Sequence, residues 1–431
     1  MVSDCLSINE RGHLAMDGRD TLELASKYGT PLYVMSEMQI RRACRQFRHA
    51  IDTHYAGNGT VLYASKAMCC KGICAIMAEE KLGLDVVSGG ELYTALAGGF
   101  PAQRMFFHGS NKTPAELQYA LQSKVGTIVV DNFAELALLE QLADRMGMRQ
   151  NIFLRIKPGV DAHTHDWIRT GGIDSKFGFA LETGEAFAAA DQVLQCKNLS
   201  LAGLHFHIGS QIFDPEPFAL AARITIGFMA EIQSRLGYTI QNLNLGGGFG
   251  IRYLAHQSAS PSEQCIARMA QVIKECCANT NFPQPHILIE PGRAIAGPAG
   301  ITLYTVGAIK EIPNRRTYLS VDGGMNDNPR YALYRAEYEM LLANKATQQK
   351  QTTVTIAGHC CENDLLAEHI PLQPPAIGDI LAVLATGAYN YSMASNYNRF
   401  PRPPVVLVGE NGDDRLLVRR ETYEDVAHFD L

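Results

Sequence analysis

The stretch VLYASKAMCC (residues 61–70) contains the unit from which the fold of this chain can be worked out. Its first four residues, 61–64, are apolar and have the length of a buried β-strand. The run ends at Ser65 and Lys66, and small residues and cysteines follow. The lysine is either a surface residue whose aliphatic stem covers apolar atoms or a functional group. The neighbouring strands decide between the two.

Seven further apolar runs of this type follow, and each ends in polar residues or glycine. With residues 60–66 they form a series at 82–88, 104–109, 127–132, 152–157, 201–210, 243–250 and 287–293. Stretches with helical spacing separate them, for example 89–100, 113–123 and 133–147. Strands that alternate with helices predict a parallel sheet, and eight strands over about 250 residues is the size of a closed (β/α)8 barrel. An open, doubly wound sheet is the alternative.

The chain has 431 residues, more than the roughly 250–300 residues that one hydrophobic core serves. Past Glu290 the pattern changes to apolar runs joined by turns, and residues 403–426 predict a hairpin with Asn411-Gly412 as its turn. We therefore predict an α/β chain with two domains. A TIM-like (β/α)8 barrel covers residues 36–297, and residues 1–35 and 298–431 form a second, C-terminal β-domain (a β-sandwich or barrel).

The composition is that of a globular protein with a small ligand. Hydrophobic residues make up 46% of the chain, charged residues 19%, and the net charge is −6, so the chain lacks the basic excess expected of a protein that binds nucleic acid or an anionic membrane. The eleven cysteines are an odd number and include adjacent pairs, which suits a reducing cytoplasm better than a disulfide framework. No signal peptide or membrane-spanning run is recognisable. We expect a cytoplasmic protein.

If the sheet closes, the polar residues at the strand ends gather on the rim where barrel enzymes carry their catalytic groups. Each residue alone has an ordinary explanation, such as a helix cap for a strand-end aspartate, but their grouping predicts an active site. The long connection 158–179 suggests an elaborated loop over it. The rim residues are Lys66, Asp85, Ser88, His108, Asp131, Arg155, His205, His207, Gly246, Gly247, Gly248, Glu290 and Arg293.

The glycine run GGGFG (246–250) follows the seventh strand. The loops after strands 7 and 8 are a common phosphate site of barrel enzymes, and glycine lets backbone N–H groups approach an anion. A plain tight turn is the alternative. Arg293, just past the eighth strand, offers positive charge to the same phosphate or to a substrate carboxylate.

A lysine beside a phosphate site suggests pyridoxal phosphate, attached to Lys66 as a Schiff base. Glu290, facing the pyridine nitrogen, would keep that nitrogen protonated, which carbanion chemistry requires of the cofactor. His205 and His207 are two residues apart and share one face of their strand. One of them is placed to stack on the cofactor ring.

Two alternatives come from other classes of protein. His-x-His is also a pair of metal ligands, so a metal-dependent barrel hydrolase is one of them. Such hydrolases usually carry this pair on the first strand, whereas here it follows the sixth. The other alternative is a cofactor-binding or regulatory protein without activity, which the intact Lys66 argues against. We expect no bound metal.

The chain resembles the fold type III pyridoxal-phosphate decarboxylases, and most closely the branch that acts on diaminopimelate. The resemblance runs from about residue 28 to residue 408 and rests on YGTPLYVMSE, YASKA, LDVVSGGEL, DSKFGF, HFHIGSQ, GGGFG, EPGR, CCEND and TGAYNYSMASNYN. It implies decarboxylation of meso-diaminopimelate at its D-centre to L-lysine and CO2, the last step of lysine biosynthesis. A related decarboxylase of D-ornithine, D-lysine or arginine is the alternative, and an amino-acid racemase is a more distant one.

The resemblance also assigns roles to single residues and implies a homodimer, in which the segment with Cys361 and Glu362 completes the partner's site. Lys66 and Cys361 are the catalytic residues, Cys361 as proton donor. Cofactor contacts are assigned to Lys66, His207, Ser210, Gly246, Gly247, Gly248, Glu290 and Tyr389, and substrate contacts to Arg293, Arg330, Tyr334, Glu362 and Tyr389.

Two positions depart from the family pattern. The family usually reads Cys-Glu-Ser-x-Asp where this chain has Cys361-Glu362-Asn363-Asp364, one residue shorter. The loop must therefore close differently. Pro329 precedes Arg330, where the family more often has proline after the arginine, and the fixed φ of proline is expected to shift the carboxylate clamp slightly.

Overall fold

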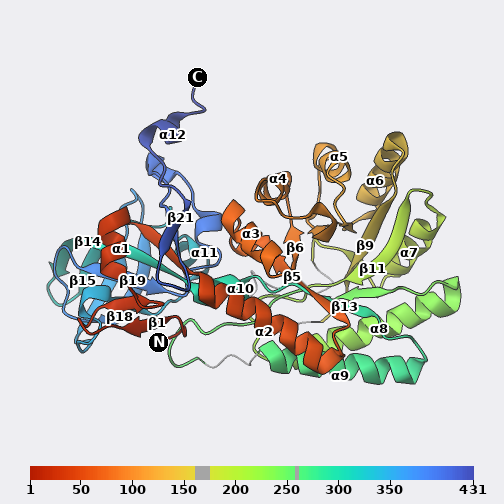
Figure 1. The fold of residues 1–431 in the computed structure, drawn as a ribbon, viewed down its shortest axis with the longest axis horizontal. Helices are drawn as coiled ribbons and strands as arrows, with labels where there is room; N and C mark the ends of the chain where they lie inside the picture. The colour runs from red at the N-terminus through yellow and green to blue at the C-terminus, as the bar shows by residue number, and fades with distance from the viewer. Residues whose placement is uncertain (161–174, 258–261) are drawn as a thin grey trace. The chain divides into compact units, whose positions relative to one another are not determined.

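The computed structural model describes residues 1–160, 175–257 and 262–431. Most of the predicted loop 158–179 lies outside the described residues. The chain divides into two compact units (Figure 1). One consists of Ala43–Gly250 and Ala259–Gly292, here called the barrel unit, and the other of Met1–Arg42, Ile251–Ser258 and Arg293–Leu431, here called the β-unit. Among the described residues, no helix has both the length and the apolar character needed to cross a membrane.

The barrel unit contains a closed sheet of eight parallel strands, as predicted. Each strand pairs with the next, β8 pairs with β9, and β13 pairs with β5 to close the ring, which excludes the open sheet. The strands are β5 (Gly59–Ala64), β6 (Gly83–Val86), β7 (Met105–Phe107), β8 (Thr127–Val130), β9 (Gln150–Lys157), β11 (Leu199–His205), β12 (Asn242–Asn244) and β13 (His286–Ile289). The two-residue β10 (Phe179–Ala180) pairs with the end of β9.

Helices connect the strands, and several begin at the caps that their sequences provide. Ser88 accepts a hydrogen bond from Glu91 N, and Thr113 forms a capping box with Glu116. In Figure 1, α4 to α6 lie on one side of the barrel strands and α8 and α9 on the other. The connecting helices are α3 (Lys71–Glu79), α4 (Gly89–Ala97), α5 (Pro114–Gln122), α6 (Phe133–Met146), α7 (Glu185–Gln195), α8 (Glu216–Leu236) and α9 (Ser262–Thr280).

The expectation of a helix after all eight strands is wrong for the last one. β13 leads into the four-residue α10 (Arg293–Ala296), which belongs to the β-unit. The long α2 (Glu37–Tyr55) instead precedes the first strand, and its end contacts α9, where Lys274 Nζ donates to the carbonyl of His54 at 2.7 Å. The helix that completes the ring therefore comes first in the chain.

The interior of the barrel is filled by side chains from two pairs of neighbouring strands, β5 with β13 and β8 with β9. Leu62, Val129, Phe153 and Leu288 form one buried cluster. Gly203 on β11 makes room for it, because a Cβ there would lie 2.5 Å from Cζ of Phe153. The barrel is a packed core, so ligand chemistry belongs at its rim.

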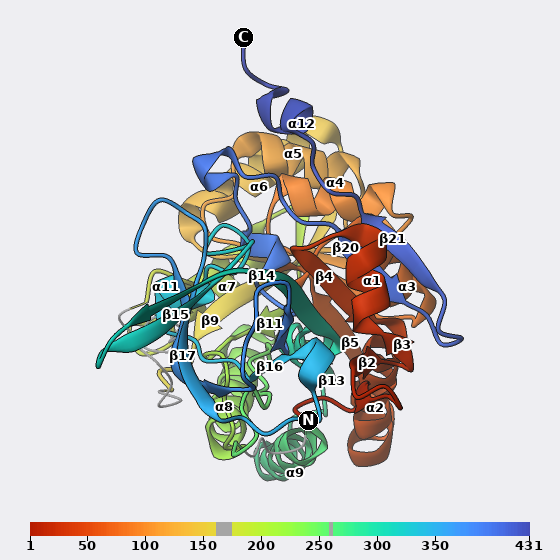
Figure 2. The ribbon, with the colours of Figure 1, turned by 90° about the vertical axis from the view of Figure 1, so that its left-hand side faces the viewer.

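The β-unit is built on a mixed sheet that combines both ends of the chain (Figure 2). β4 (Leu32–Ser36) lies between β14 (Gly300–Ile312), to which it is antiparallel, and β20 (Val405–Val408), to which it is parallel. The other strands of this sheet are β15 (Arg316–Val321), β16 (Met340–Leu342), β17 (Thr352–Ala357), β18 (Leu365–Leu372), β19 (Ile380–Leu384) and β21 (Asp414–Val418).

Smaller elements complete the β-unit. The strands β1 (Leu6–Ile8), β2 (Leu14–Met16) and β3 (Arg19–Asp20) form a separate three-stranded sheet, followed by α1 (Thr21–Tyr28). The predicted C-terminal hairpin is confirmed as β20 and β21, and Gly412 adopts the left-handed φ of 74° in its turn. The hairpin ends at Val418, and Thr422 caps the short α12 (Tyr423–Ala427), so the predicted range 403–426 was too long.

Candidate active site

Lys66 lies just past the end of β5, in a single 3-10 turn that spans Ser65–Ala67. Its Nζ is 3.6 Å from Oδ2 of Asp85, which follows on the neighbouring strand β6 and is fully buried. Burial raises the pKa of Asp85, and its interactions with the nearby His108 and Lys66 act in the opposite direction. The turn is fixed by Ser65, whose hydroxyl donates to Glu91 at 2.9 Å. The amino group of Lys66 therefore lies beside the buried carboxyl group of Asp85 on the rim.

Glu290, at the end of β13, is enclosed by groups from three other strands. Oε1 lies 3.0 Å from Nε2 of His108 and accepts a hydrogen bond from Asn244 at 2.6 Å, while Oε2 lies 3.3 Å from Nε2 of His205. Burial alone would raise the pKa of Glu290, but the contacts with His108 and His205 hold it well below its usual value. The structure thus provides a buried carboxylate that stays ionised.

The two histidines of His-x-His have different partners. His205 ends β11, and its ring packs edge-on against His108 at 4.7 Å between centroids. Burial lowers the pKa of His205 to about 4, so its ring is neutral near neutral pH. His207 lies beyond the strand, and its Nδ1 accepts a hydrogen bond from Gly247 N at 3.2 Å. Burial, reinforced by Lys66, lowers the pKa of His207 well below its usual value.

The glycine run is packed so closely that no side chain fits. A Cβ at Gly246 would lie 2.3 Å from the carbonyl oxygen of Phe206, one at Gly247 2.1 Å from that of Glu290, and one at Gly248 2.3 Å from that of Gly209. Gly246 and Gly248 also have positive φ values of 69° and 107°. The run therefore forms a tight turn that only glycine fits, and its use as an anion cradle stays a prediction.

Ser210 lies in a segment that runs beside the glycine loop. The adjacent Ile212 donates its N–H to the carbonyl of Gly248 at 2.9 Å, and Ile212 and Phe249 form an isolated β-bridge. The hydroxyl of Ser210 and the glycine backbone therefore belong to the same part of the rim. This combination of hydroxyl and side-chain-free backbone fits a phosphate group.

Other rim residues have structural partners. Ser88 is the N-cap of α4. Asp131 accepts a hydrogen bond from Gly178 N at 3.0 Å and lies 3.9 Å from Nε of Arg155. The guanidinium of Arg155 also packs over the ring of Phe177 at 4.2 Å. These residues support the rim and are secondary candidates for ligand contacts.

The β-unit contains a cluster of its own, in which two buried arginines share one tyrosine. Nη1 of Arg293 donates to Oη of Tyr253 at 2.6 Å, and Nη1 of Arg330 donates to the same oxygen at 2.9 Å. Arg330 Nη1 also donates to Tyr338 at 2.8 Å. The ring of Tyr389, a residue with a φ of 64°, lies 4.6 Å from Cζ of Arg293. Two cations in a buried aromatic setting suit a carboxylate ligand, and the substrate contacts of Arg293 and Arg330 stay a prediction.

Tyr334 ends α11 (Arg330–Tyr334), four residues after Arg330 and thus on the same side of the helix. The helix begins at Pro329, which has an αR conformation with φ −76°. The proline therefore precedes the first helical residue and leaves the backbone N–H groups of the helix undisturbed. The arginine and the tyrosine are available to one ligand.

The segment with Cys361 and Glu362 lies at the surface of the β-unit, and both residues are exposed. Asp364 closes this shortened loop by accepting hydrogen bonds from Cys360 N at 2.9 Å and Met325 N at 2.8 Å. Glu362 accepts a hydrogen bond from Tyr397 Oη at 2.5 Å. The carboxylate of Asp364 thus fixes the shortened loop from within.

Sequence reasoning missed Asn244, Tyr253, Tyr338 and Tyr397 as members of these clusters. Asn244 carried a signal, since it is a polar residue in an otherwise apolar strand end. The metal-site alternative involves other residues than the His-x-His pair. The described groups that are close enough to bind one ion are His108, His205 and Glu290, and His207 is not among them. The two histidines of this set are the ones that contact Glu290 in the cluster described above.

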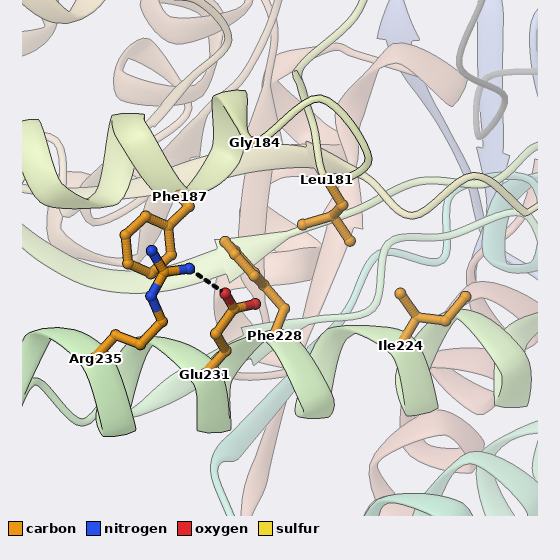
Figure 3. A pocket seen from close by; sticks show the side chains of 7 residues that line it. All are labelled: Leu181, Gly184, Phe187, Ile224, Phe228, Glu231 and Arg235. Atoms are coloured by element: carbon orange, nitrogen blue, oxygen red, sulfur yellow. Dashed lines mark hydrogen bonds and ion pairs between the residues drawn. The ribbon is translucent and has the colours of Figure 1, made fainter.

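A groove on the outside of the barrel has different chemistry (Figure 3). It lies between α7 and α8 and has a volume of about 480 Å³. Figure 3 shows Arg235 and Glu231 of α8 as an ion pair, with the guanidinium beside the ring of Phe187 at 3.8 Å. It contains no nucleophile and no buried acid, so the rim remains the candidate active site.

The chain is similar to known proteins over nearly its full length. Residues 37–297 match the family described as pyridoxal-dependent decarboxylase, pyridoxal binding domain. The chain is 51% identical to the diaminopimelate decarboxylase of Bacillus subtilis over 98% of this chain and 96% of that one, and 44% identical to that of Staphylococcus aureus over 96% of each.

Solved structures of such relatives have the same fold. The diaminopimelate decarboxylase of M. jannaschii superposes with a TM-score of 0.92 at 34% identity and covers 100% of this chain and 98% of its own. That of Helicobacter pylori, complexed with L-lysine, superposes with a TM-score of 0.86 at 29% identity and covers 95% and 98%.

Proposed function

Because this chain belongs to the pyridoxal-dependent decarboxylase family, we propose that it converts meso-diaminopimelate to L-lysine and CO2. The observation that carries the proposal is its 51% identity, over nearly the full length, to a diaminopimelate decarboxylase. A similarity of this extent includes both the barrel unit and the β-unit. The reaction breaks the bond between the D-centre and its carboxylate, and a proton takes the place of the CO2.

Pyridoxal phosphate, when bound, withdraws electrons from the breaking bond, and the rim residues are suited to hold it. Lys66 is the amine to which it would attach. The backbone of the glycine loop and the hydroxyl of Ser210 would hold its phosphate, and His207, fixed by Gly247 N, would contact its ring. Glu290 is ionised and buried, so it would favour a proton on the ring nitrogen. Tyr389 completes the cofactor contacts.

The substrate has a second carboxylate and a second amino group at its distal L-centre. Arg293, Arg330 and Tyr334 bind that carboxylate, Glu362 binds the amino group, and Tyr389 lies against the bound molecule. A mono-carboxylate such as ornithine would leave two buried guanidinium groups without an anion, which is unfavourable. The arginine pair therefore selects for the longer, dicarboxylic substrate.

The carbon that loses CO2 must gain a proton, and Cys361 or Lys66 supplies it. In a single chain the thiol of Cys361 is exposed. We propose that two chains form a homodimer in which Cys361 and Glu362 of one complete the active site of the other. The barrel at residues 36–297 then binds the cofactor, residues 1–35 and 298–431 contribute to the shared site, and the enzyme acts in the cytoplasm.

The reaction is tested by incubating purified holoenzyme with meso-diaminopimelate and measuring L-lysine and CO2 together. Equal amounts of both are expected, with no product from a Lys66→Ala variant. Lys71→Ala is the matched control, because Lys71 is an exposed lysine at the start of α3, and it should retain full activity. Release of CO2 only from D-ornithine, D-lysine or arginine would contradict the substrate, and isomerised substrate without CO2 would contradict the reaction.

The shared site is tested by mixing two inactive variants, Lys66→Ala and Glu362→Ala. If sites are shared, half of the randomly formed dimers are mixed, and each of these has one intact site. Activity should therefore return to about a quarter of the wild-type value. A mixture as inactive as its components, with exchange of subunits confirmed by mass, would exclude shared sites.

A further inference from the structure

Tyr253 lies between the two arginines of the β-unit. Its phenol oxygen accepts one hydrogen bond from Arg293, at 2.6 Å, and another from Arg330, at 2.9 Å. The two arginines are each 8% exposed and Tyr253 is 7% exposed, so water does not screen these charges well. Two buried guanidinium groups repel one another, and the oxygen that accepts a hydrogen bond from both offsets part of that repulsion.

The electrostatics of Tyr253 agree with this role. Burial alone would raise the pKa of its phenol, but the positive charges of Arg293 and Arg330 lower it below its ordinary value. The oxygen therefore carries more negative charge than that of a tyrosine in water. Both arginines gain a charge-assisted bond from it, which is about twice as strong as a neutral one.

The geometry also leaves the ligand-binding edge of Arg330 available. Within the described part of the chain, the hydrogen bonds of Arg330 to Tyr253 and Tyr338 both use Nη1. Nη2 and Nε form the other edge of the planar fork, which matches the two oxygens of a carboxylate. Tyr338 is in turn supported by Asn390 Nδ2 at 3.5 Å and packs edge-on against Tyr253 at 5.2 Å. Tyr253 and Tyr338 thus set the orientation of the guanidinium group of Arg330.

We propose that Tyr253 is a positioning residue that fixes Arg293 and Arg330 at the separation required by the distal carboxylate of the substrate. The inference rests on the proposed function and deepens it, because it assigns substrate selection to a residue outside the substrate-contacting set. Tyr253 follows the glycine loop by only a few residues in the chain, in the segment Ile251–Ser258 of the β-unit. A single short stretch of the chain, 246–253, therefore contains both the glycine loop and the tyrosine that joins the two arginines.

The test compares Tyr253→Phe with wild-type holoenzyme in steady-state kinetics. The phenylalanine keeps the ring and removes only the shared oxygen, so KM for meso-diaminopimelate should rise about 10- to 100-fold while kcat changes less than about threefold. Tyr331→Phe is the matched control. Tyr331 directly follows Arg330 in α11, but its hydroxyl donates to Glu368 at 2.7 Å. The variant therefore loses a hydrogen bond that involves neither arginine, and it should behave as wild type.

Competitive inhibition separates positioning from a general structural defect. The inhibition constant of L-lysine, which has a carboxylate, should rise in parallel with KM. The inhibition constant of cadaverine, a diamine of the same length without a carboxylate, should stay unchanged. An unchanged KM, or an equal rise for both inhibitors, would overturn the proposal.

A second variant keeps the test decisive if Tyr253→Phe does not fold. Tyr338→Phe removes the hydrogen bonds of Tyr338 with Arg330 and Asn390 but leaves Tyr253 bonded to both arginines, so a smaller rise in KM is expected, with the same difference between L-lysine and cadaverine. No difference between the two inhibitors in this variant would count against positioning of the pair by its tyrosines. Failure of the proposed function would be seen in a different result, since the wild-type enzyme would then form no L-lysine and CO2 from meso-diaminopimelate.

Discussion

Replacing Gly247 by alanine adds one methyl group at the centre of the phosphate loop. The new Cβ would lie 2.1 Å from the carbonyl oxygen of Glu290 and 3.6 Å from its Cβ. Because the first contact is with backbone, no side-chain rotation relieves it. The loop must move by about 1 Å to reach an ordinary contact distance. Gly247 N also donates to His207 Nδ1 at 3.2 Å, so the same movement disturbs the histidine proposed to stack on the cofactor.

The expected loss follows from the bonds that this movement breaks. A hydrogen bond from a backbone N–H to a charged group contributes about 1.5–3 kcal/mol, which corresponds to roughly 10- to 100-fold in affinity for pyridoxal phosphate. Suppose that cofactor is present at 100 times the wild-type Kd. It then stabilises the wild type by about 2.7 kcal/mol, and a 100-fold weaker variant by only about 0.4 kcal/mol.

The assay titrates cofactor-free protein with pyridoxal phosphate, followed by absorbance, and measures urea unfolding with and without cofactor. Gly227→Ala is the matched control. Gly227 lies in α8 with nothing within 4 Å of an added Cβ, so this change should leave cofactor affinity unchanged and stabilise the helix by up to about 1 kcal/mol. A Gly247→Ala protein that bound the cofactor as tightly as wild type would refute the steric argument.

Two further predictions concern stability. Lys112→Met should cost about 3–5 kcal/mol in urea unfolding, since it removes the partner of the buried Glu135 at 2.7 Å; a loss below about 1 kcal/mol would contradict it. Burial raises the pKa of Asp327 to about 7, so the folded state binds its proton more tightly than the unfolded state, and stability should fall as pH rises from about 4 to about 7. Asp327→Asn should abolish the fall in stability that Asp327 causes. When Tm is measured for both proteins from pH 5 to pH 8, the Tm of the wild type should therefore fall more towards high pH than that of the variant.

The local patterns of the sequence were enough for the barrel. Each strand is a short apolar run that ends in polar residues or glycine, and each connection has helical spacing, so both element types are encoded within a few residues. Apart from the last connection, where the four-residue α10 follows β13, the errors lie at the boundaries. The runs 201–210 and 243–250 extend beyond β11 and β12, because the backbone turns away after the strand, where glycine allows conformations that other residues avoid.

The residue types of the site were also evident from the sequence, whereas the contacts between them were not. Lys66 and Glu290 were found as strand-end residues, but the pairing of Glu290 with His108 and His205 depends on the order of strands around the closed ring. The pairing of Arg330 with Tyr253 joins residues 77 positions apart. No local pattern encodes contacts over such distances.

The sequence by itself determined the strands, the helices between them and the set of polar groups at the strand ends, because these depend on neighbouring residues. Only the tertiary structure decided which of those groups meet. Parallel strands bring their carboxyl ends to one edge whatever their separation in the chain, and pairing of β13 with β5 makes that edge a ring. The tertiary structure also placed β4, from the N-terminal segment, between β14 and β20, since hydrogen bonding and burial in a mixed sheet are satisfied by partners from any part of the chain.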